Sequence, residues 1–248
     1  MTAALPIAIG LVALLYASVG HAGATGYIAA MTLFGIEPDV IRPTALVLNV
    51  LVATIATVQF IRAGHFQAGL FWPLAAASVP CALVGGSLRL PTVAFEKLVG
   101  IVLAVSAVRL VRESWSPGRA TPDASRFGPP TRPAMALFGS GIGMLSGLTG
   151  VGGGVFLTPV LLALGAAPVK QIAAVTAPFI LVNSLAGLAG GLIAGRALPP
   201  VSLPVITAAV LGGAIGAHLG AVRLPVRALQ LLMGAVLAIA SVKLFGLM

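Results

Sequence analysis

A cluster of glycines interrupts an otherwise apolar stretch in the second half of the chain. The stretch runs from Ser146 to Pro159 and contains Gly147, Gly150, Gly152, Gly153 and Gly154. Each glycine lowers helix propensity by about 1 kcal/mol relative to alanine, and the proline removes a backbone donor. Broken backbone at membrane depth must be buried in protein or line a wet cavity, because lipid offers no hydrogen-bond partners. The pattern therefore predicts two half-helices that meet at a glycine-rich break.

The chemistry expected at this break is the binding of an oxyanion. A half-helix that begins inside a membrane presents unpaired amide groups and the positive end of its dipole, and glycines let a solute approach those amides closely. The candidate binding residues here are Gly150, Gly152, Gly153, Gly154, Thr149 and Thr158. The alternative is close packing of small residues against a neighbouring helix. We favour that alternative for Gly212, Gly213 and Gly216.

A related interruption lies near the N-terminus, where residues 20–26 read GHAGATG. Its candidate binding residues are His21, Gly23 and Thr25. His21 is the one titratable side chain expected at a break deep in the membrane, where it would contact the substrate or carry a proton. The alternative is a neutral histidine that caps the broken backbone.

Polar side chains also occur in the apolar segment that follows each break. Asn49 follows the first break, and Thr176 and Asn183 follow the second. A side-chain amide in a membrane helix is costly unless it bonds across helices. These three residues therefore either hold helices together or contact the ligand, and they complete the set of candidate binding residues.

The composition is typical of an all-α polytopic membrane protein. Of the 248 residues, 59% are hydrophobic and 8% are charged, whereas soluble domains carry about 25% charged residues. The net charge of +9 lies almost wholly in loops and at segment ends, as the positive-inside bias predicts; it would also attract an anion. The single cysteine, Cys81, supports neither a disulfide nor a cysteine-based metal cluster. We expect no metal, no cofactor and no nucleic-acid partner.

The apolar segments fall into two halves of about four helical segments each, the first segment of each half being broken. We expect them at 5–35, 43–61, 70–89, 93–111, 134–165, 171–194, 200–222 and 226–247, with a loop at 36–42. Residues 112–132 combine arginine with proline and are too polar to insert and too rich in proline to be helical. The predicted organisation is a first half at 1–111, a linker at 112–132 and a second half at 133–248.

The two halves repeat each other in sequence. Gly20 and Gly23 align with Gly150 and Gly153, and ordered matches continue to the end of each half. Corresponding broken segments in two halves are the best sequence indicator of a transporter binding site between them. The sequence does not decide whether the repeat is parallel or inverted. Four crossings per half would relate the halves by an axis along the membrane normal, whereas re-entrant hairpins would leave three crossings and an inverted repeat.

Acidic residues are confined to loops and segment ends: Glu37, Asp39, Glu96, Glu113 and Asp123. A carboxylate at the bilayer centre costs about 2.5–3.5 kcal/mol or more. The lack of one there argues against a proton pump or a cation-selective transporter and suits a permeant anion. Common hydrolase and zinc-protease motifs are also missing from the sequence. A permease for a small anion is therefore the leading interpretation; the alternatives are a membrane-embedded enzyme and a non-transporting assembly factor.

The second break resembles the signature of a known family. Residues 147–156 read GLTGVGGGVF and are followed by Pro159, and 170–177 read KQIAAVTA before Asn183-Ser184. This pattern is similar to that of the sulfite exporter TauE/SafE family. The resemblance implies a multi-pass permease of the bacterial inner membrane that moves small, often sulfur-containing anions such as sulfite or organosulfonates. The particular anion, the direction, the coupling and the oligomeric state, including a homo-oligomer, stay open.

Overall fold

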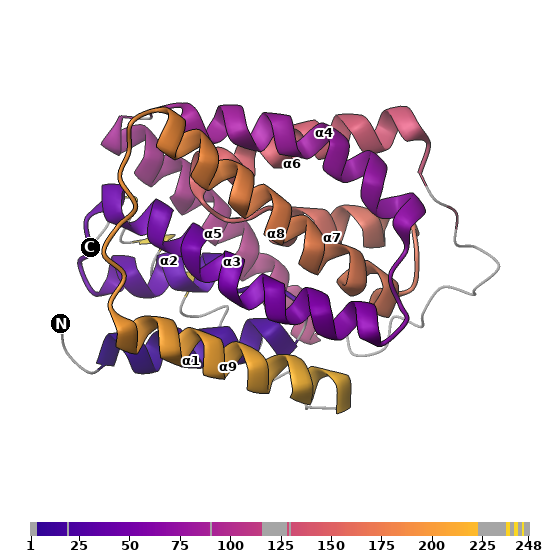
Figure 1. Cartoon of the computed structure of the whole chain (residues 1–248), viewed down its shortest axis with the longest axis horizontal. Coiled ribbons are helices and arrows are strands. Elements are labelled where there is room, and N and C mark those ends of the chain that lie inside the picture. Colours follow the sequence, from indigo (N-terminus) through magenta and orange to yellow (C-terminus); the bar gives the residue numbers. More distant parts are fainter. Residues whose placement is uncertain are drawn as a thin grey trace.

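The computed structural model describes residues 4–18, 20–89, 91–115, 128, 130–222, 237–238, 241–242 and 245. Within these residues the chain forms helices and no strands. The helices are α1 (Ala4–Ser18), α2 (Ala24–Leu33), α3 (Pro38–Arg62), α4 (Ala68–Ser87), α5 (Thr92–Trp115), α6 (Arg132–Thr149), α7 (Gly154–Ala163), α8 (Val169–Ile193) and α9 (Leu203–Val222) (Figure 1). Most of the segment expected at 226–247, and residues 116–127 of the expected linker, lie outside the described residues.

The connections α1–α2 and α6–α7 are short and rich in glycine. Helix α1 ends at Ser18 and α2 begins at Ala24, while α6 ends at Thr149 and α7 begins at Gly154. Five glycines in these connections have φ angles between 76° and 106°: Gly20, Gly23, Gly150, Gly152 and Gly153. Glycine adopts this left-handed conformation without the steric cost that a Cβ atom imposes. The chain can therefore leave one helix and enter the next within a few residues.

Small residues bring two helix pairs into backbone contact. Along one face of α6, glycines at every fourth residue touch carbonyl oxygens of α4: Gly139, Gly143 and Gly147 meet Leu74, Ser78 and Ala82. On α9, Gly212 and Gly216 touch the carbonyl oxygens of Gly10 and Leu14 on α1, which confirms the packing interpretation of these two glycines. Such spacing is typical of close helix contacts in membranes. The α4/α6 and α1/α9 pairs flank α3 and α8 (Figure 1).

Helices α3 and α8 run through the middle of the molecule in opposite directions. Arg42 and Leu46, near the start of α3, line the same cavity as Leu192 at the end of α8. At the other end, Gln67 donates a hydrogen bond of 2.6 Å from Nε2 to Oε1 of Gln171, near the start of α8. We call these two ends of the bundle the cavity end and the Gln67 end. Helix α4 returns from the Gln67 end to the cavity end, and α6 runs parallel to it.

Apolar side chains cover the outside of the bundle. Three pairs, each spaced four residues apart, are between 50% and 63% exposed: Ile7 and Leu11 on α1, Ile101 and Val105 on α5, and Leu211 and Ile215 on α9. Apolar stripes of this kind call for a non-aqueous surrounding. Among the described residues, α3, α4 and the part of α8 from Lys170 to Ile193 are long and apolar enough to cross a membrane. The chain is thus a helical membrane protein.

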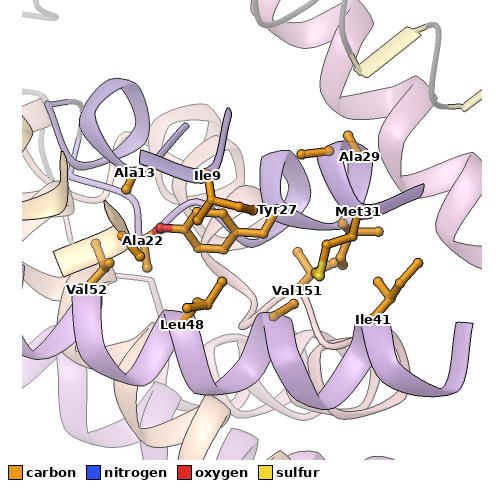
Figure 2. Close-up of a cluster of buried hydrophobic side chains, with 14 of the residues drawn as sticks. Ile9, Ala13, Ala22, Tyr27, Ala29, Met31, Ile41, Leu48, Val52 and Val151 are labelled. Carbon is orange, nitrogen blue, oxygen red and sulfur yellow. The ribbon is translucent and has the colours of Figure 1, made fainter. Parts of the chain in front are cut away.

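The two glycine-rich connections share one buried core. Tyr27 of α2 is fully buried, and its ring lies among side chains that include Ile9 and Leu48 (Figure 2). Val151, from the α6–α7 connection, belongs to the same cluster. Residues separated by more than a hundred positions therefore pack together at the centre of the protein.

Candidate functional site

The α6–α7 connection is contacted by polar side chains from both central helices. Nδ2 of Asn49, on α3, donates to the carbonyl oxygen of Val151 and to Oγ of Ser184 on α8, both at 3.4 Å. A Cβ atom placed on Gly152 would lie 2.5 Å from Asn49 Nδ2 and 3.0 Å from Ser184 Oγ. Gly152 thus leaves just enough room for these two side chains to face the connection. The predicted residues Asn49 and Gly152 are brought together, and Ser184 joins them.

Side chains cover the N-terminus of α7. A Cβ atom on Gly153 would lie 3.0 Å from Phe179, and one on Gly154 would touch Ile180 and lie 3.1 Å from Thr176 Cγ2. Gly150 lies instead against the carbonyl oxygen of Arg42 on α3. The α7 amide end is therefore closed by residues of α8 in this conformation, and a ligand would reach it only after those side chains move.

Two buried polar atoms near this connection have no hydrogen-bond partner within the part of the chain that the structure describes. They are Oδ1 of Asn49 and Oγ of Ser146. Buried polar atoms are nearly always paired, so each exception calls for an explanation. A polar ligand or water at the connection would supply the missing partners, because a hydroxyl donates and accepts and a side-chain amide offers both an oxygen and an NH₂ group.

Thr149 and Asn183 have structural partners. Oγ1 of Thr149 donates to the carbonyl oxygen of Leu145 at 2.7 Å and accepts from the Val151 amide at 3.3 Å, so it closes the end of α6. Nδ2 of Asn183 donates to Oγ of Ser78 at 3.0 Å and to the carbonyl oxygen of Phe179 at 2.8 Å. The amide group of Asn183 therefore faces α4, whereas that of Asn49 faces the α6–α7 connection.

The α1–α2 connection is filled by two tyrosines, whose role the sequence did not reveal. The hydroxyl of Tyr27 donates to the carbonyl oxygen of Ala22 at 2.7 Å, and its ring would lie 2.9 Å from a Cβ atom on Gly23. The hydroxyl of Tyr16 shares a 2.7 Å hydrogen bond with Oγ1 of Thr25. Gly23 and Thr25 are thus occupied by aromatic neighbours, and this connection offers less to a solute than the α6–α7 connection does.

His21 links the two halves of the chain. Its Nε2 lies 3.1 Å from Oγ1 of Thr158 on α7, and that hydroxyl lies 3.2 Å from Oγ1 of Thr176 on α8. Three predicted site residues, one from the α1–α2 connection and two from the second half, therefore form one hydrogen-bonded chain. A chain of this kind can carry a proton or hold a polar solute, because each hydroxyl both donates and accepts.

Replacing His21 with leucine is expected to lower solute uptake about fivefold, because losing a partly buried hydrogen bond of about 1 kcal/mol weakens the contact between the halves. His21→Gln keeps a group that donates and accepts, so uptake should stay near that of the wild type. Initial uptake rates in vesicles containing equal amounts of each protein make the comparison. Equal rates for the leucine and glutamine variants would exclude a role for the His21–Thr158 hydrogen bond.

A cavity of about 490 Å³ opens at the cavity end, and none of the residues predicted to bind substrate lines it. Its lining includes Arg42, Arg89 and Arg196 together with Asp39. The loop expected at 36–42, which would include Arg42, is wrong, because α3 begins at Pro38 and Arg42 is a buried residue of its second turn. Nothing local in the sequence distinguishes this arginine from a loop arginine.

The three arginines bind the ends of two helices. Arg42 donates from Nη2 to the carbonyl oxygens of Gly85 and Gly86, at 2.7 and 2.8 Å, and from Nη1 to that of Leu88 at 3.2 Å. Arg196 donates to the carbonyl oxygens of Gly86 and Leu88. These carbonyls end α4, where the negative end of a helix dipole favours cations.

Arg89 caps the other helix, since it donates from Nη2 to the carbonyl oxygen of Ala194, just after α8, at 3.3 Å. Burial lowers the pKa of the Arg196 guanidinium, the positive charge of Arg89 lowers this pKa further, and Asp39 raises it. The arginines are therefore close enough to repel one another, and the cavity carries an excess of positive charge.

These features define a helical membrane protein with a buried polar connection between two sets of helices and a basic cavity at one end. The family model for the sulfite exporter TauE/SafE matches residues 5–244, so the chain belongs to the TauE/SafE family. It is similar to the probable membrane transporter protein y4hK of Sinorhizobium fredii (strain NBRC 101917 / NGR234), with 42% identity over 195 residues that cover 79% of this chain and 78% of that protein. No solved structure matches the chain. The protein is a membrane permease, whose partners are a small solute and the lipid bilayer.

Proposed function

We propose that the protein is a secondary permease for a small anion, sulfur-containing as in sulfite, an organosulfonate or a related organic acid, and that it performs no enzymatic reaction. The anion binds at the α6–α7 connection, between the two halves. The observation that carries this proposal is the buried N-terminus of α7, with Asn49 of the first half and Ser184 of the second beside it. Helix N-termini favour anions because free amides and the helix dipole both point toward the ligand.

The proposed architecture is a duplicated one with inverted halves, at 1–111 and 133–248, joined by a linker at 112–132. In this arrangement α1 to α4 correspond to α6 to α9. The helix pairs α1/α9 and α4/α6 then become equivalent contacts, each joining the first helix of one half to the fourth of the other. Corresponding helices α3 and α8 run in opposite directions, which supports an inverted repeat with α1–α2 and α6–α7 as hairpins. Inverted repeats often place the substrate at their interface.

The proposed location is the inner membrane, which the chain crosses several times with the Gln67 end in the cytoplasm. Arg62, Arg132 and Lys170 lie at or near that end, where α6 begins. Cytoplasmic loops carry an excess of lysine and arginine. The cavity end then faces the outside of the cell.

Cysteine labelling tests this orientation. In a Cys81→Ser background, Ala197→Cys at the cavity end should react with a membrane-impermeant maleimide in intact spheroplasts. Ala63→Cys, at an exposed position directly after α3, should react only after the membrane is opened. Labelling of Ala63→Cys alone in intact spheroplasts would show that the opposite orientation is correct. Labelling of both cysteines would contradict the assignment of the cavity end and the Gln67 end to opposite sides of the membrane.

The transport proposal is tested by uptake into vesicles that contain the purified protein. Radiolabelled sulfite, taurine, acetate and a cation, rubidium, are compared with and without a pH gradient. We expect uptake of one or more of the sulfur-containing anions above that of protein-free vesicles, and no uptake of rubidium. Uptake of rubidium, or of none of the solutes, would refute a permease for this class of anion.

A further inference from the structure

We propose that the cavity lined by Arg42, Arg89 and Arg196 is a second anion site, a vestibule that captures a small oxyanion before it reaches the α6–α7 connection. This inference rests on the permease function proposed above and adds an entry site to it. Three arginines and one aspartate line the cavity, so an anion that enters meets an excess of positive charge. Concave sites with charge of one sign raise the local concentration of oppositely charged solutes.

The arginines are held in position before any ligand arrives. Their hydrogen bonds to the ends of α4 and α8 fix the guanidinium groups at the rim and wall of the cavity. Each guanidinium carries five N–H donors. The hydrogen bonds to carbonyl oxygens described above number three for Arg42, two for Arg196 and one for Arg89. The remaining donors suit a carboxylate, sulfite or sulfonate, because guanidinium groups bind planar pairs of oxygens in a bidentate manner.

The vestibule lies one helical turn from the proposed transport site. Leu46 lines the cavity and is almost fully buried, and its side chain lies 3.3 Å from the position of a Cβ atom on Gly187 of α8. Asn49, which contacts the α6–α7 connection, follows Leu46 by three residues, or about 4.5 Å along the helix axis. Leu46 and Gly187 therefore form the floor that separates the captured anion from the connection in this conformation.

The test measures the charge of the vestibule independently of transport. Ala197 lines the cavity. The variant Ala197→Cys is made in a Cys81→Ser background. Its reaction rates with a sulfonate-bearing and a trimethylammonium-bearing methanethiosulfonate give an anion-to-cation ratio. We expect this ratio to fall about tenfold when Arg89 and Arg196 are both replaced by glutamine, while the ratio at Ala63→Cys stays unchanged. If the double variant does not fold, Arg89→Gln alone, which loses one hydrogen bond at an exposed position, should lower the ratio about threefold.

Sulfate serves as the probe for a bound anion, with chloride at equal ionic strength as the control. Sulfate should slow labelling of Ala197→Cys in a saturable way when the arginines are present, and not when they are glutamine. Equal slowing in both proteins, or slowing by chloride alone, would mean that the arginines only cap the helix ends. If sulfate protects Ala197→Cys in a saturable way but the protein takes up no anion, the vestibule is supported and the permease function is refuted. If sulfate gives no protection when the arginines are present, and uptake kinetics are normal in the glutamine variant, the permease is supported and the vestibule is refuted.

Discussion

Replacing Gly152 with alanine is expected to reduce anion uptake at least about tenfold while the protein still inserts and folds. The new Cβ atom would lie 2.5 Å from Nδ2 of Asn49 and 2.9 Å from Ile180, so Asn49 has to move away from Val151 and Ser184. Loss of the Asn49 hydrogen bonds corresponds to about 1.5 kcal/mol, or roughly a factor of ten in rate. The measurement is the initial uptake rate in vesicles of equal protein content.

The matched control is Gly64→Ala. Gly64 also has a positive φ angle, 75°, but apart from its chain neighbours no part of the described structure lies within 4 Å of its Cβ position. Both substitutions thus carry the same left-handed strain of about 1–2 kcal/mol, and only Gly152→Ala disturbs Asn49. Uptake should therefore stay normal in the control. Equal losses in the two variants would mean that backbone strain, and not the geometry of the α6–α7 connection, limits transport.

Replacing Gly143 with valine is expected to destabilise the whole bundle. Gly143 lies in backbone contact with Ser78 on α4, so a side chain there would overlap the Ser78 carbonyl oxygen. Overpacking of this kind costs about 1–3 kcal/mol even where side chains can yield, and a helix backbone yields less. We expect the melting temperature in detergent to fall by about 5–10 °C, or the protein to be lost from the membrane fraction.

Gly141→Val provides the comparison on the same helix. Outside its own helix, none of the residues that the structure describes lies within 4 Å of a Cβ atom at Gly141, so this variant carries the same change in helix propensity without the contact with α4. Its melting temperature should remain within a few degrees of the wild type, as is usual for surface positions. A similar decrease for both variants would show that helix propensity, and not the α4/α6 contact, sets the stability.

The features that depend on local backbone chemistry were accessible from the sequence. Glycines and a proline in an apolar run disfavour a continuous helix wherever the helix packs, and this pattern predicts an interruption within 146–159. The structure has α6 ending at Thr149 and α7 beginning at Gly154. Apolar composition likewise identified a helical membrane protein, since burial of that much apolar sequence in a soluble core is not feasible.

Features that depend on contacts between residues far apart in the chain could not be predicted from the sequence. The carbonyl partners of Arg42 lie 43 to 46 residues away, so nothing near Arg42 in the sequence indicates that the ends of two helices would surround it. From the sequence alone, Asn49 and Asn183 have the same predicted role. Neighbouring residues on a helix point about 100° apart, so Ser184 faces Asn49 while Asn183 faces Ser78 on α4.

The two glycine-rich connections show the same limit. Their glycines recur in sequence, yet Tyr27 folds back onto Ala22 in the first connection, whereas the second is contacted by Asn49 from the other half. Both tyrosine and asparagine occur in the apolar segments, and only the packing of the helices decides which of them reaches a connection. The sequence thus predicts where backbone is irregular but not which side chains occupy the space.

Equilibrium binding of radiolabelled sulfite to the purified protein tests the central claim, an anion site at the α6–α7 connection, most directly. The measurement uses the Arg89→Gln, Arg196→Gln protein, so that capture in the vestibule does not contribute, with and without the added substitution Gly152→Ala. We predict saturable binding in the first protein and its loss in the second. Unchanged binding after Gly152→Ala, or no binding in either protein, would place the anion elsewhere and contradict the account.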